Sequence, residues 1–504
     1  MDDVHKLALE TIQNNKQAII FVPSRASAEK TAEELSKLTS LQCLELEKEI
    51  LNAASSPTKQ CRRLSHCIRK GIAFHHAGLL QEQKDLIEEE FKKGTVKVIC
   101  ATPTLAAGLS LPVFRVIITS LKRYSGSWGM DWIPVLEYLQ MAGRAGRPEY
   151  ERFGEAISIA KSETEKQEIY ERYICGVPEE IYSKLAVEPV LRTYLLSLIS
   201  SGIIRDQKTS SEFFARTFWA HQFKDLPKLE TIMEKMLHLL EGWKFIGGRG
   251  DNDFVTANNL EGKKLRPTLI GKRISELYLD PLTARHLLDC LQRFDGQKNS
   301  FSLLQMICNT LEMRPLLRIK SKEQDSIQEE LVKRYERLLQ DEPSAFDINF
   351  DDFMNSIKTA LFFEAWIDEK DEEFLLEAYS IPPGEVRGKI TVADWLLYAA
   401  EELAGLLHNT AAVKEIRKVR ARLQYGVKEE LLPLLKLRGI GRVRARRLHS
   451  HGIKDLGDLK KTDLTTLSQL LGKAVAESVQ EQVGEGISEV PEGKRKGQTS
   501  ILKY

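Results

Sequence analysis

Four short apolar runs, separated by segments with helical spacing, occupy the N-terminal third of the chain and constrain the fold more than any other feature. The runs are rich in Val, Ile and Ala and lie at 18–22, 96–100, 113–121 and 155–159. Such runs are typical of strands that are buried on both faces, and strands that alternate with helices form parallel sheets. The sequence therefore predicts an α/β domain with an open parallel sheet over residues 1–183.

After residue 183 the spacing of apolar residues becomes that of helices. They recur three or four positions apart at 190–203, 213–221 and 228–240, and two short apolar segments that follow suit the strands of a winged helix. From 269 onward nearly every segment is helical. We therefore expect mostly α domains after the sheet. They are a winged helix at 184–268, a helical bundle at 269–425, a basic helical domain at 426–483 and a flexible tail at 484–504.

Charge and cysteine content exclude several classes of protein. The chain has 73 Lys and Arg against 72 Asp and Glu, so any surface that binds nucleic acid must be local. Seven cysteines in 504 residues do not form a disulfide framework, and we expect them to be free thiols in a reducing compartment, the cytoplasm. No run of apolar residues is long enough for a transmembrane helix, so we expect no membrane contact.

The segment 140–148, Gln-Met-Ala-Gly-Arg-Ala-Gly-Arg-Pro, is the most specific motif. Arg144 and Arg147 are one helical turn apart, and the small residues between them let a partner approach closely. Guanidinium groups bind phosphate oxygens and stabilise charge on a transferring phosphoryl group. The alternative is a plain basic surface helix. We expect Gln140, Arg144 and Arg147 to be catalytic residues at a nucleotide.

A second motif, Leu-Arg-Gly-Ile-Gly-Arg-Val-Arg-Ala-Arg-Arg-Leu, lies at 437–448 within a segment that is locally strongly basic. Two glycines around one apolar residue predict a tight turn whose N–H groups face a phosphate at a helix N-terminus. A dinucleotide fingerprint is the rival, but an arginine stands where its third glycine should be. A solvated basic face is the other alternative. The motif resembles the helix-hairpin-helix, and we expect contact with the DNA backbone from Gly439, Gly441, Arg442, Arg444, Arg446 and Arg447.

The N-terminal domain resembles the second RecA-like motor domain of superfamily 2 helicases. The segment 140–148 is similar to motif VI of that family, 102–112 to motif V, 74–79 to motif IVa and 18–25 to motif IV. The resemblance implies that Gly108, Arg144 and Arg147 bind ATP. A histidine pair taken alone is more often structural. The DNA contacts that the resemblance implies are Ser24, Arg25, His75, His76, Thr102 and Thr104.

The order of the domains narrows the resemblance to the archaeal HelQ-type, or Hjm, repair helicases of the Ski-like branch. These are ATP-dependent enzymes that move 3′ to 5′ on single-stranded DNA and act at stalled forks. The resemblance implies a ratchet helix, here 391–407, in which Trp395 stacks on a base and Arg387 assists. The alternative for Trp395 is a place in the core. We further expect a monomer that is cytoplasmic and associated with the nucleoid.

Two other segments carry hypotheses. Residues 120–133 are expected to form a strand-separating hairpin with Trp128 at its turn, and an ordinary loop is the alternative. The end of the chain resembles a sliding-clamp peptide through Gln498, Ile501 and Tyr504. A plain disordered tail is the alternative there.

The loop that cradles the phosphates of ATP is missing from the sequence. No Gly-x4-Gly-Lys-Ser/Thr occurs, and no acidic pair follows an apolar strand. We therefore expect that a missing N-terminal RecA-like domain binds most of the ATP and Mg²⁺, and that this chain alone is inactive. A non-catalytic DNA-binding or adaptor protein of helicase shape and a fragment of a Ski-like RNA helicase remain the alternative functions.

Overall fold

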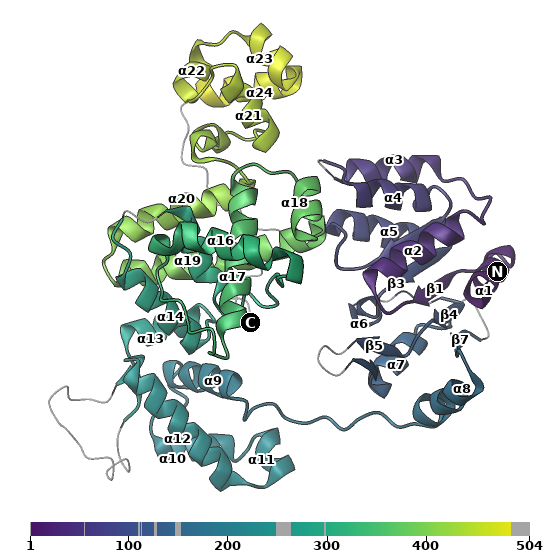
Figure 1. The fold of residues 1–504 in the computed structure, drawn as a ribbon, viewed down its shortest axis with the longest axis horizontal. Helices are drawn as coiled ribbons and strands as arrows, with labels where there is room; N and C mark the ends of the chain where they lie inside the picture. The colour runs from purple at the N-terminus through teal and green to yellow at the C-terminus, as the bar shows by residue number, and fades with distance from the viewer. Residues whose placement is uncertain are drawn as a thin grey trace. The chain divides into compact units, whose positions relative to one another are not determined.

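The structure is a computed structural model that describes residues 2–54, 56–108, 111, 113–124, 129–146, 153–247, 264–296 and 299–484. The chain divides into two compact units (Figure 1). The first unit comprises Met1–Lys184 and Asp371–Lys389, and the second comprises the rest. Among the described residues, none of the helices combines the length and the apolar character that spanning a membrane requires.

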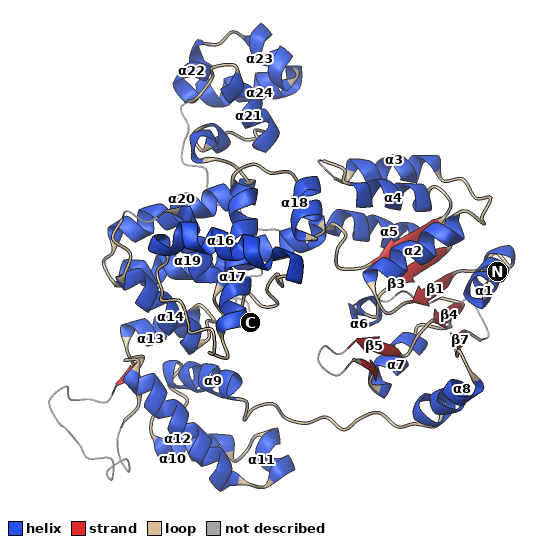
Figure 2. Ribbon diagram, in the orientation of Figure 1, coloured by secondary structure: helices blue, strands red, loops and turns tan. Residues whose placement is uncertain are grey.

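A parallel sheet of five strands forms the centre of the first unit, and its order is β2-β3-β1-β4-β7 (Figure 2). This confirms the predicted fold class. Four strands match the predicted runs, whereas β2 was not predicted, because its four residues form a short run that ends in a histidine. The strands are β1 (Ala18–Phe21), β2 (Ile72–His75), β3 (Val98–Ala101), β4 (Arg115–Ile118) and β7 (Glu155–Ser158).

Helices pack on this sheet through apolar faces. Helix α2 contacts β2 and β3, and α7 contacts β4. Phe74 of β2 and Phe91 of α5 are fully buried and belong to the apolar core, whose removal from water stabilises the domain. The helices are α1 (Asp3–Gln13), α2 (Arg25–Ser36), α3 (Leu44–Asn52), α4 (Lys59–Ile68), α5 (Gln81–Lys93), α6 (Thr104–Gly108), α7 (Val135–Ala142), α8 (Glu163–Ile169) and a π-helix (Tyr170–Ile174).

A β-hairpin follows β4, as the sequence analysis predicted. Strands β5 (Lys122–Tyr124) and β6 (Met130–Trp132) pair antiparallel, and the predicted turn residue Trp128 lies outside the described residues. The base of the hairpin is braced, because the Trp132 ring lies 4.0 Å from Lys122 Nζ and the Tyr173 hydroxyl donates to the Ile133 carbonyl at 2.6 Å. The hairpin therefore has a fixed base.

Residues 371–389 cluster with the first unit, although the sequence analysis assigned them to the helical bundle at 269–425. They form α18 (Glu372–Tyr379) and the first turns of α19 (Pro383–Leu406). Helix α19 was expected to begin at Thr391. It begins eight residues earlier because a proline is well tolerated in the first turn of a helix, where its missing N–H has no partner to lose.

The second unit begins with helices that lead to two short strands. The strands pair antiparallel, as expected for this segment. Arg192 of α9 forms a buried bidentate pair with Asp280, with nitrogen–oxygen distances of 2.6 and 2.7 Å. The elements are α9 (Glu188–Ser200), α10 (Gln207–Phe214), α11 (Phe218–Phe223), α12 (Leu226–Gly242), β8 (Ile246–Gly247), β9 (Arg266–Pro267) and α13 (Leu269–Glu276).

A helical bundle follows, with α15 and α17 packed against each other at its centre. Every residue of α15 from Phe301 to Cys308 is buried, which is typical of a helix that is covered on all sides. Short 3-10 turns lie at 321–323 and 335–337. The helices are α14 (Pro281–Gln292), α15 (Ser300–Cys308), α16 (Gln324–Arg334), α17 (Phe350–Ile367), the remainder of α19 and α20 (Thr410–Tyr425).

The last described domain is a small helical bundle with its own apolar core. Its first residues meet Trp366 of α17, whose indole N–H donates to the Leu423 carbonyl at 2.7 Å. Gly426 has φ +66°, and an added Cβ there would lie 2.6 Å from the Trp366 ring, so the position requires glycine. The helices are α21 (Arg442–Ser450), α22 (Leu456–Lys461), α23 (Leu464–Leu471) and α24 (Lys473–Gly484), after 3-10 turns at 429–431 and 434–436.

Glu312 offers a test of the packing at the start of α14. Burial raises its pKa above the ordinary value of 4.5, although hydrogen bonds from Thr283 and the Asp280 N–H oppose the change. Because the folded-state pKa is raised, the free energy of unfolding falls as pH rises through that pKa. We expect Glu312→Gln to raise the melting temperature near pH 7 and to flatten its pH dependence. Exposed Glu329→Gln is the control, and a lower melting temperature for Glu312→Gln near pH 7 would contradict the assignment.

Candidate nucleic-acid and nucleotide sites

A groove of about 780 Å³ lies at the carboxyl ends of the strands in the first unit. Ser24 follows β1, Ala77 follows β2, Thr102 follows β3 and Ser120 follows β4, and all four line the groove. Residues from different predicted motifs therefore meet because parallel strands end at one edge of the sheet. The other lining residues are Pro23, Arg25, Pro103, Thr104, Lys122, Arg123, Ile133, Pro134, Leu136, Glu137 and Gln140.

The hydroxyl groups of the groove lie at the starts of two helices. Ser24 caps α2, since its Oγ accepts from the Ser27 N–H at 3.1 Å. The hydroxyls of Thr102 and Thr104 are 2.9 Å apart at the start of α6. Helix N-termini with hydroxyl groups suit phosphate oxygens. With Arg25, the structure thus brings together four of the residues predicted to contact DNA.

The two histidines predicted to contact DNA are buried, and their contact with DNA stays a prediction. His75 Nε2 lies 2.9 Å from Glu88 Oε1, and His76 Nε2 lies 3.3 Å from Glu29 Oε1. The His76 ring is inaccessible to solvent and stacks on Phe74 with 5.5 Å between ring centroids. Carboxylates inside the domain, rather than phosphates, are the partners of both rings.

The cations that line the groove have carboxylate partners. Arg25 forms an ion pair with Glu385, and Arg123 Nη1 lies 2.8 Å from Glu137 Oε2. Arg25 was predicted to contact DNA from sequence, whereas the two hairpin cations, Lys122 and Arg123, were not named as contacts. Their signal in the sequence was two adjacent basic residues that open the predicted hairpin.

Motifs V and VI are joined by backbone contacts. Val113 N–H donates to the Arg144 carbonyl at 2.9 Å, and the Gly146 N–H donates to the Val113 carbonyl at 2.6 Å. The Arg144 guanidinium donates through Nη2 to the carbonyl of Ala106 in α6, the helix that ends at Gly108. Within the described part of the chain its buried Nε has no hydrogen-bond partner, which leaves a donor for an anionic oxygen. Arg147 lies outside the described residues.

Arg144 is a candidate for the arginine side of an ATP site. Arg144 fits a phosphate through its unpaired Nε. In the part of the chain that the structure describes, no three His, Cys, Asp or Glu side chains gather in a way that could hold a metal ion.

The glycine turn at the start of α21 has the predicted form. Gly439 has φ +83°, and Gly441 is the N-cap residue of α21 without a side chain that could occupy the helix N–H groups. Arg444 donates to the Gly439 carbonyl at 2.8 Å, and Arg447 donates to the Leu470 carbonyl at 2.8 Å. A carbonyl is a neutral acceptor, so neither hydrogen bond offsets the positive charge of its guanidinium group.

Arg446, which was expected to contact the DNA backbone, pairs with two carboxylates. Its Nη2 lies 2.5 Å from Glu369 Oε1 and 2.7 Å from Glu430 Oε1. Burial alone would raise the pKa of Glu369, but hydrogen bonds from Arg446 and the Lys428 N–H outweigh it, and the pKa lies below its ordinary value. Arg442 lies 5.2 Å from the Trp366 ring centroid. Arg446 thus holds the hairpin domain to the loop after α17.

Trp395 is half-buried in the second unit, and its indole N–H donates to the Leu277 carbonyl at 3.2 Å. One end of the ring is therefore fixed while part of it faces solvent. Arg387 is half-exposed and pairs with Glu372 at 3.1 Å. The predicted assistance of Trp395 by Arg387 remains a prediction.

The C-terminal domain has a second glycine turn, which was not predicted from the sequence. Gly472, with φ +86°, separates α23 from α24, and Lys473 opens α24. The sequence Leu-Gly-Lys at 471–473 repeats the pattern Ile-Gly-Arg at 440–442 and was the signal that could have revealed it. The two turns differ in backbone conformation, because Gly441 has φ −104° and Gly472 has φ +86°.

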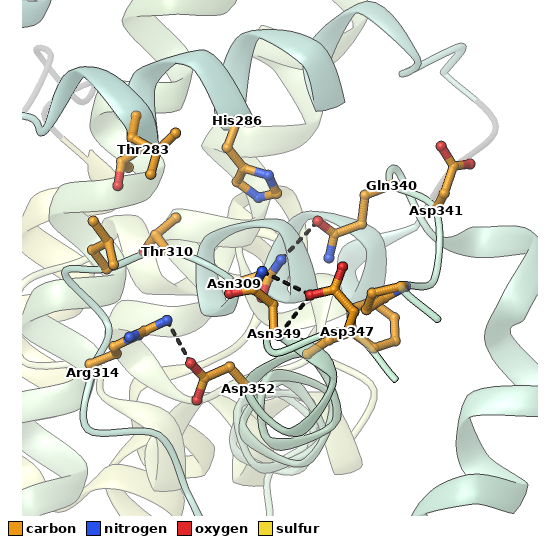
Figure 3. Close-up of a pocket in the computed structure, with 14 residues that line it drawn as sticks. Thr283, His286, Asn309, Thr310, Arg314, Gln340, Asp341, Asp347, Asn349 and Asp352 are labelled. Atoms are coloured by element: carbon orange, nitrogen blue, oxygen red, sulfur yellow. Dashed lines mark hydrogen bonds and ion pairs between the residues drawn. The ribbon is translucent and has the colours of Figure 1, made fainter. Parts of the chain in front are cut away.

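A second cavity, of about 360 Å³, lies between α14, the end of α15 and the loop before α17 (Figure 3). Asn309 donates to the Gln340 side chain at 2.9 Å, and Arg314 lies 2.6 Å from Asp352. The polar groups that line it pair mostly with one another. No residue predicted from the sequence as a site residue lines this cavity.

Three protein-family models match the chain. They are the helicase conserved C-terminal domain at residues 1–149, domain 4 of archaeal helicases at 301–426 and the SAM-like helix-hairpin-helix tandem at 431–485. The first covers the groove, and the last covers both glycine turns. The models agree with the RecA-like, helical and helix-hairpin-helix parts of the predicted fold.

Relatives named ATP-dependent DNA helicase Hel308 match along nearly the whole chain. The protein of Pyrococcus horikoshii is 35% identical over 503 residues, which cover 98% of this chain and 67% of the relative. The proteins of Methanocella arvoryzae and Methanococcus vannielii are 34% and 36% identical and cover 97% and 93% of this chain. The chain spans about two thirds of the length of these relatives. It belongs to the Hel308 family of archaeal superfamily 2 helicases.

Proposed function

We propose that this chain is the part of an ATP-dependent DNA helicase that grips and moves single-stranded DNA. The observation that carries the proposal is the groove, where residues that follow four parallel strands present hydroxyls and helix N-termini. These groups suit the phosphates of a nucleic-acid backbone without reading its bases. The helix-hairpin-helix domain in the same chain favours DNA over RNA.

The groups divide into three sets of proposed roles. Ser24, Thr102 and Thr104 hold the DNA backbone in the groove. Trp395 stacks on a base, and the two glycine turns of the C-terminal domain bind the backbone of a second stretch. Arg144 and Arg147, with Gln140 beside the groove, act on the phosphate of ATP when an upstream RecA-like domain holds it with Mg²⁺.

Finer properties follow from membership in this helicase branch. We infer 3′ to 5′ movement, action on forked DNA during replication-fork repair, and strand separation at the hairpin of β5 and β6. We also propose a monomer that is cytoplasmic and associated with the nucleoid. Binding of a sliding clamp through Gln498, Ile501 and Tyr504 is a further proposal, and these residues lie outside the described residues.

The chain alone should not hydrolyse ATP. Phosphoryl transfer requires a cradle for the phosphates and a Mg²⁺ site, and an arginine finger contributes about 10³–10⁵ in rate only to a phosphate that is already held. Adding the upstream motor domain should restore DNA-stimulated hydrolysis, and Arg147→Ala should abolish the restoration. A coupled ATPase assay measures both effects. Steady turnover by the 504-residue chain alone, lost in Arg147→Ala, would contradict this division of labour.

The same assay separates the rival functions. A non-catalytic DNA-binding or adaptor protein would show no hydrolysis after the upstream domain is added, although it would still bind DNA. A fragment of a Ski-like RNA helicase would prefer an RNA fork in a competition experiment with a DNA fork. Hydrolysis stimulated by DNA more than by RNA supports the proposal.

Trp395→Ala should weaken binding of single-stranded DNA by about 1–3 kcal/mol, the usual contribution of one stacked base. Trp395→Phe is the matched control, since it keeps a ring but loses the hydrogen bond to Leu277. We expect the Phe variant to retain most of the affinity. Fluorescence anisotropy measures the affinity for single-stranded DNA, and thermal melting measures the stability of each variant. A large loss of stability with unchanged affinity in Trp395→Ala would show that the residue only packs.

Arg444 and Arg446 should differ in their effect on DNA binding, although they lie two residues apart on α21. Arg444→Ala should lower the slope of log affinity against log salt by about 1, because one phosphate contact is lost. Arg446→Ala should leave the slope nearly unchanged, because two carboxylates already neutralise that charge. Binding titrations at several salt concentrations measure the slopes. Equal reductions in both variants would refute the distinction.

A further inference from the structure

A closed ring of contacts joins the start of α19 to two segments of the groove wall in the first unit. Helix α2 contributes Arg25 and Glu29, which are one turn apart. The loop after β2 contributes His76 and Gly78, and the start of α19 contributes the remaining two members. We call this set the groove ring: Arg25, Glu29, His76, Gly78, Gly384 and Glu385.

The contact between Gly384 and the loop after β2 is the tightest of the ring. The Gly384 N–H donates to the Gly78 carbonyl at 3.0 Å. An added Cβ on Gly384 would lie 2.1 Å from the Leu79 carbonyl oxygen and 2.6 Å from that of Ala77. Real Cβ atoms do not approach backbone oxygens so closely, so the first turn of α19 lies directly on this loop only because residue 384 is glycine.

The other contacts close the ring through α2. The Gly78 N–H donates to His76 Nδ1 at 3.1 Å. The imidazole therefore carries its proton on Nε2, which lies 3.3 Å from Glu29 Oε1. Burial alone would raise the pKa of Glu29, but hydrogen bonds from His76 and Gln60 and the charge of Arg63 outweigh it, and its pKa lies below the ordinary value. The carboxylate is thus ionised. One turn earlier, Arg25 pairs with Glu385.

We propose that Gly384 and Glu385 are positioning residues that pass a change in the DNA-filled groove to α19, the helix that continues to Trp395. The inference rests on the proposed function, because it assumes that DNA occupies the groove beside Ser24 and Ala77. It assigns Arg25 and His76 to this connection rather than to phosphate contact. Packed elements transmit a displacement because they do not deform continuously.

Hydrogen exchange of the 504-residue chain, with and without an oligothymidylate of about 16 nucleotides, tests the proposal. In the parent, DNA should slow exchange at 77–79 and also at 384–386, by about fivefold at the Gly384 amide if one net hydrogen bond is strengthened. Pro382 and Pro383 have no amide hydrogen, so a peptide that spans 381–389 reports mainly on this turn.

Two variants break the ring, and each has a matched control in the same segment. Gly384→Ala should keep the slowing at 77–79 and lose it at 384–386, whereas Gly388→Ala, which has open space for a Cβ, should behave as the parent. Glu385→Gln should likewise keep the slowing at 77–79 and lose it at 384–386, and it does so without adding an atom that clashes. Its control is Glu377→Gln, which removes the ion pair with Lys59 outside the ring and should leave the slowing at 384–386 unchanged. Melting temperatures check that each variant folds.

The possible results separate the proposal from the function on which it rests. Slowing at 384–386 that survives in Gly384→Ala and Glu385→Gln would overturn the ring as a connection. Slowing at 77–79 alone in the parent would overturn it as well, while leaving DNA in the groove. Absence of slowing at both places would overturn the groove as a DNA site and the ring with it.

Discussion

The parallel register of four neighbouring strands is the constraint on which the rest of the first unit depends. Ala18 of β1 pairs with Val98 of β3 and with Arg115 of β4, and Ile72 of β2 pairs with Val98. The strands therefore end level with one another. Each following segment begins at the same edge, and this places residues from distant parts of the sequence around one groove. A shift of one strand by a single residue would turn its buried side chains to the other face and move its loop away from the groove.

Carboxylates satisfy many of the basic groups that a reader of the sequence would assign to DNA. Arg25 pairs with Glu385, Arg123 with Glu137 and Arg446 with Glu369. Partly exposed ion pairs of this kind contribute little to stability, but they fix where a long side chain lies. The chain as a whole is nearly neutral, and the described pairs show how its basic segments are matched by acidic ones. In the proposed function, phosphate is contacted by neutral donors at helix N-termini and by guanidinium groups that donate to carbonyls, such as that of Arg444.

The sequence predicted the layout of the chain better than it predicted the environment of single side chains. Short apolar runs such as 18–22 revealed strands because burial on both faces requires a continuous apolar run. Strand β2 escaped prediction, since only three apolar residues precede the histidine that ends it. The burial of His76 depends on Glu29, which lies far away in the sequence, so no local pattern could indicate it. For the same reason the pairing of Arg446 with Glu369 appeared only in the structure.

The first unit is discontinuous in sequence, because residues 371–389 complete a domain whose strands all lie before residue 159. During synthesis the sheet can form while the second unit is still unmade, since its contacts are local compared with those of Gly384. The loop at 77–79 then stays uncovered until α18 and α19 emerge from the ribosome. The domain is thus completed only after the segment predicted to be a winged helix and most of the bundle have been translated. A chain that stopped within those domains would have a complete sheet and an open groove wall.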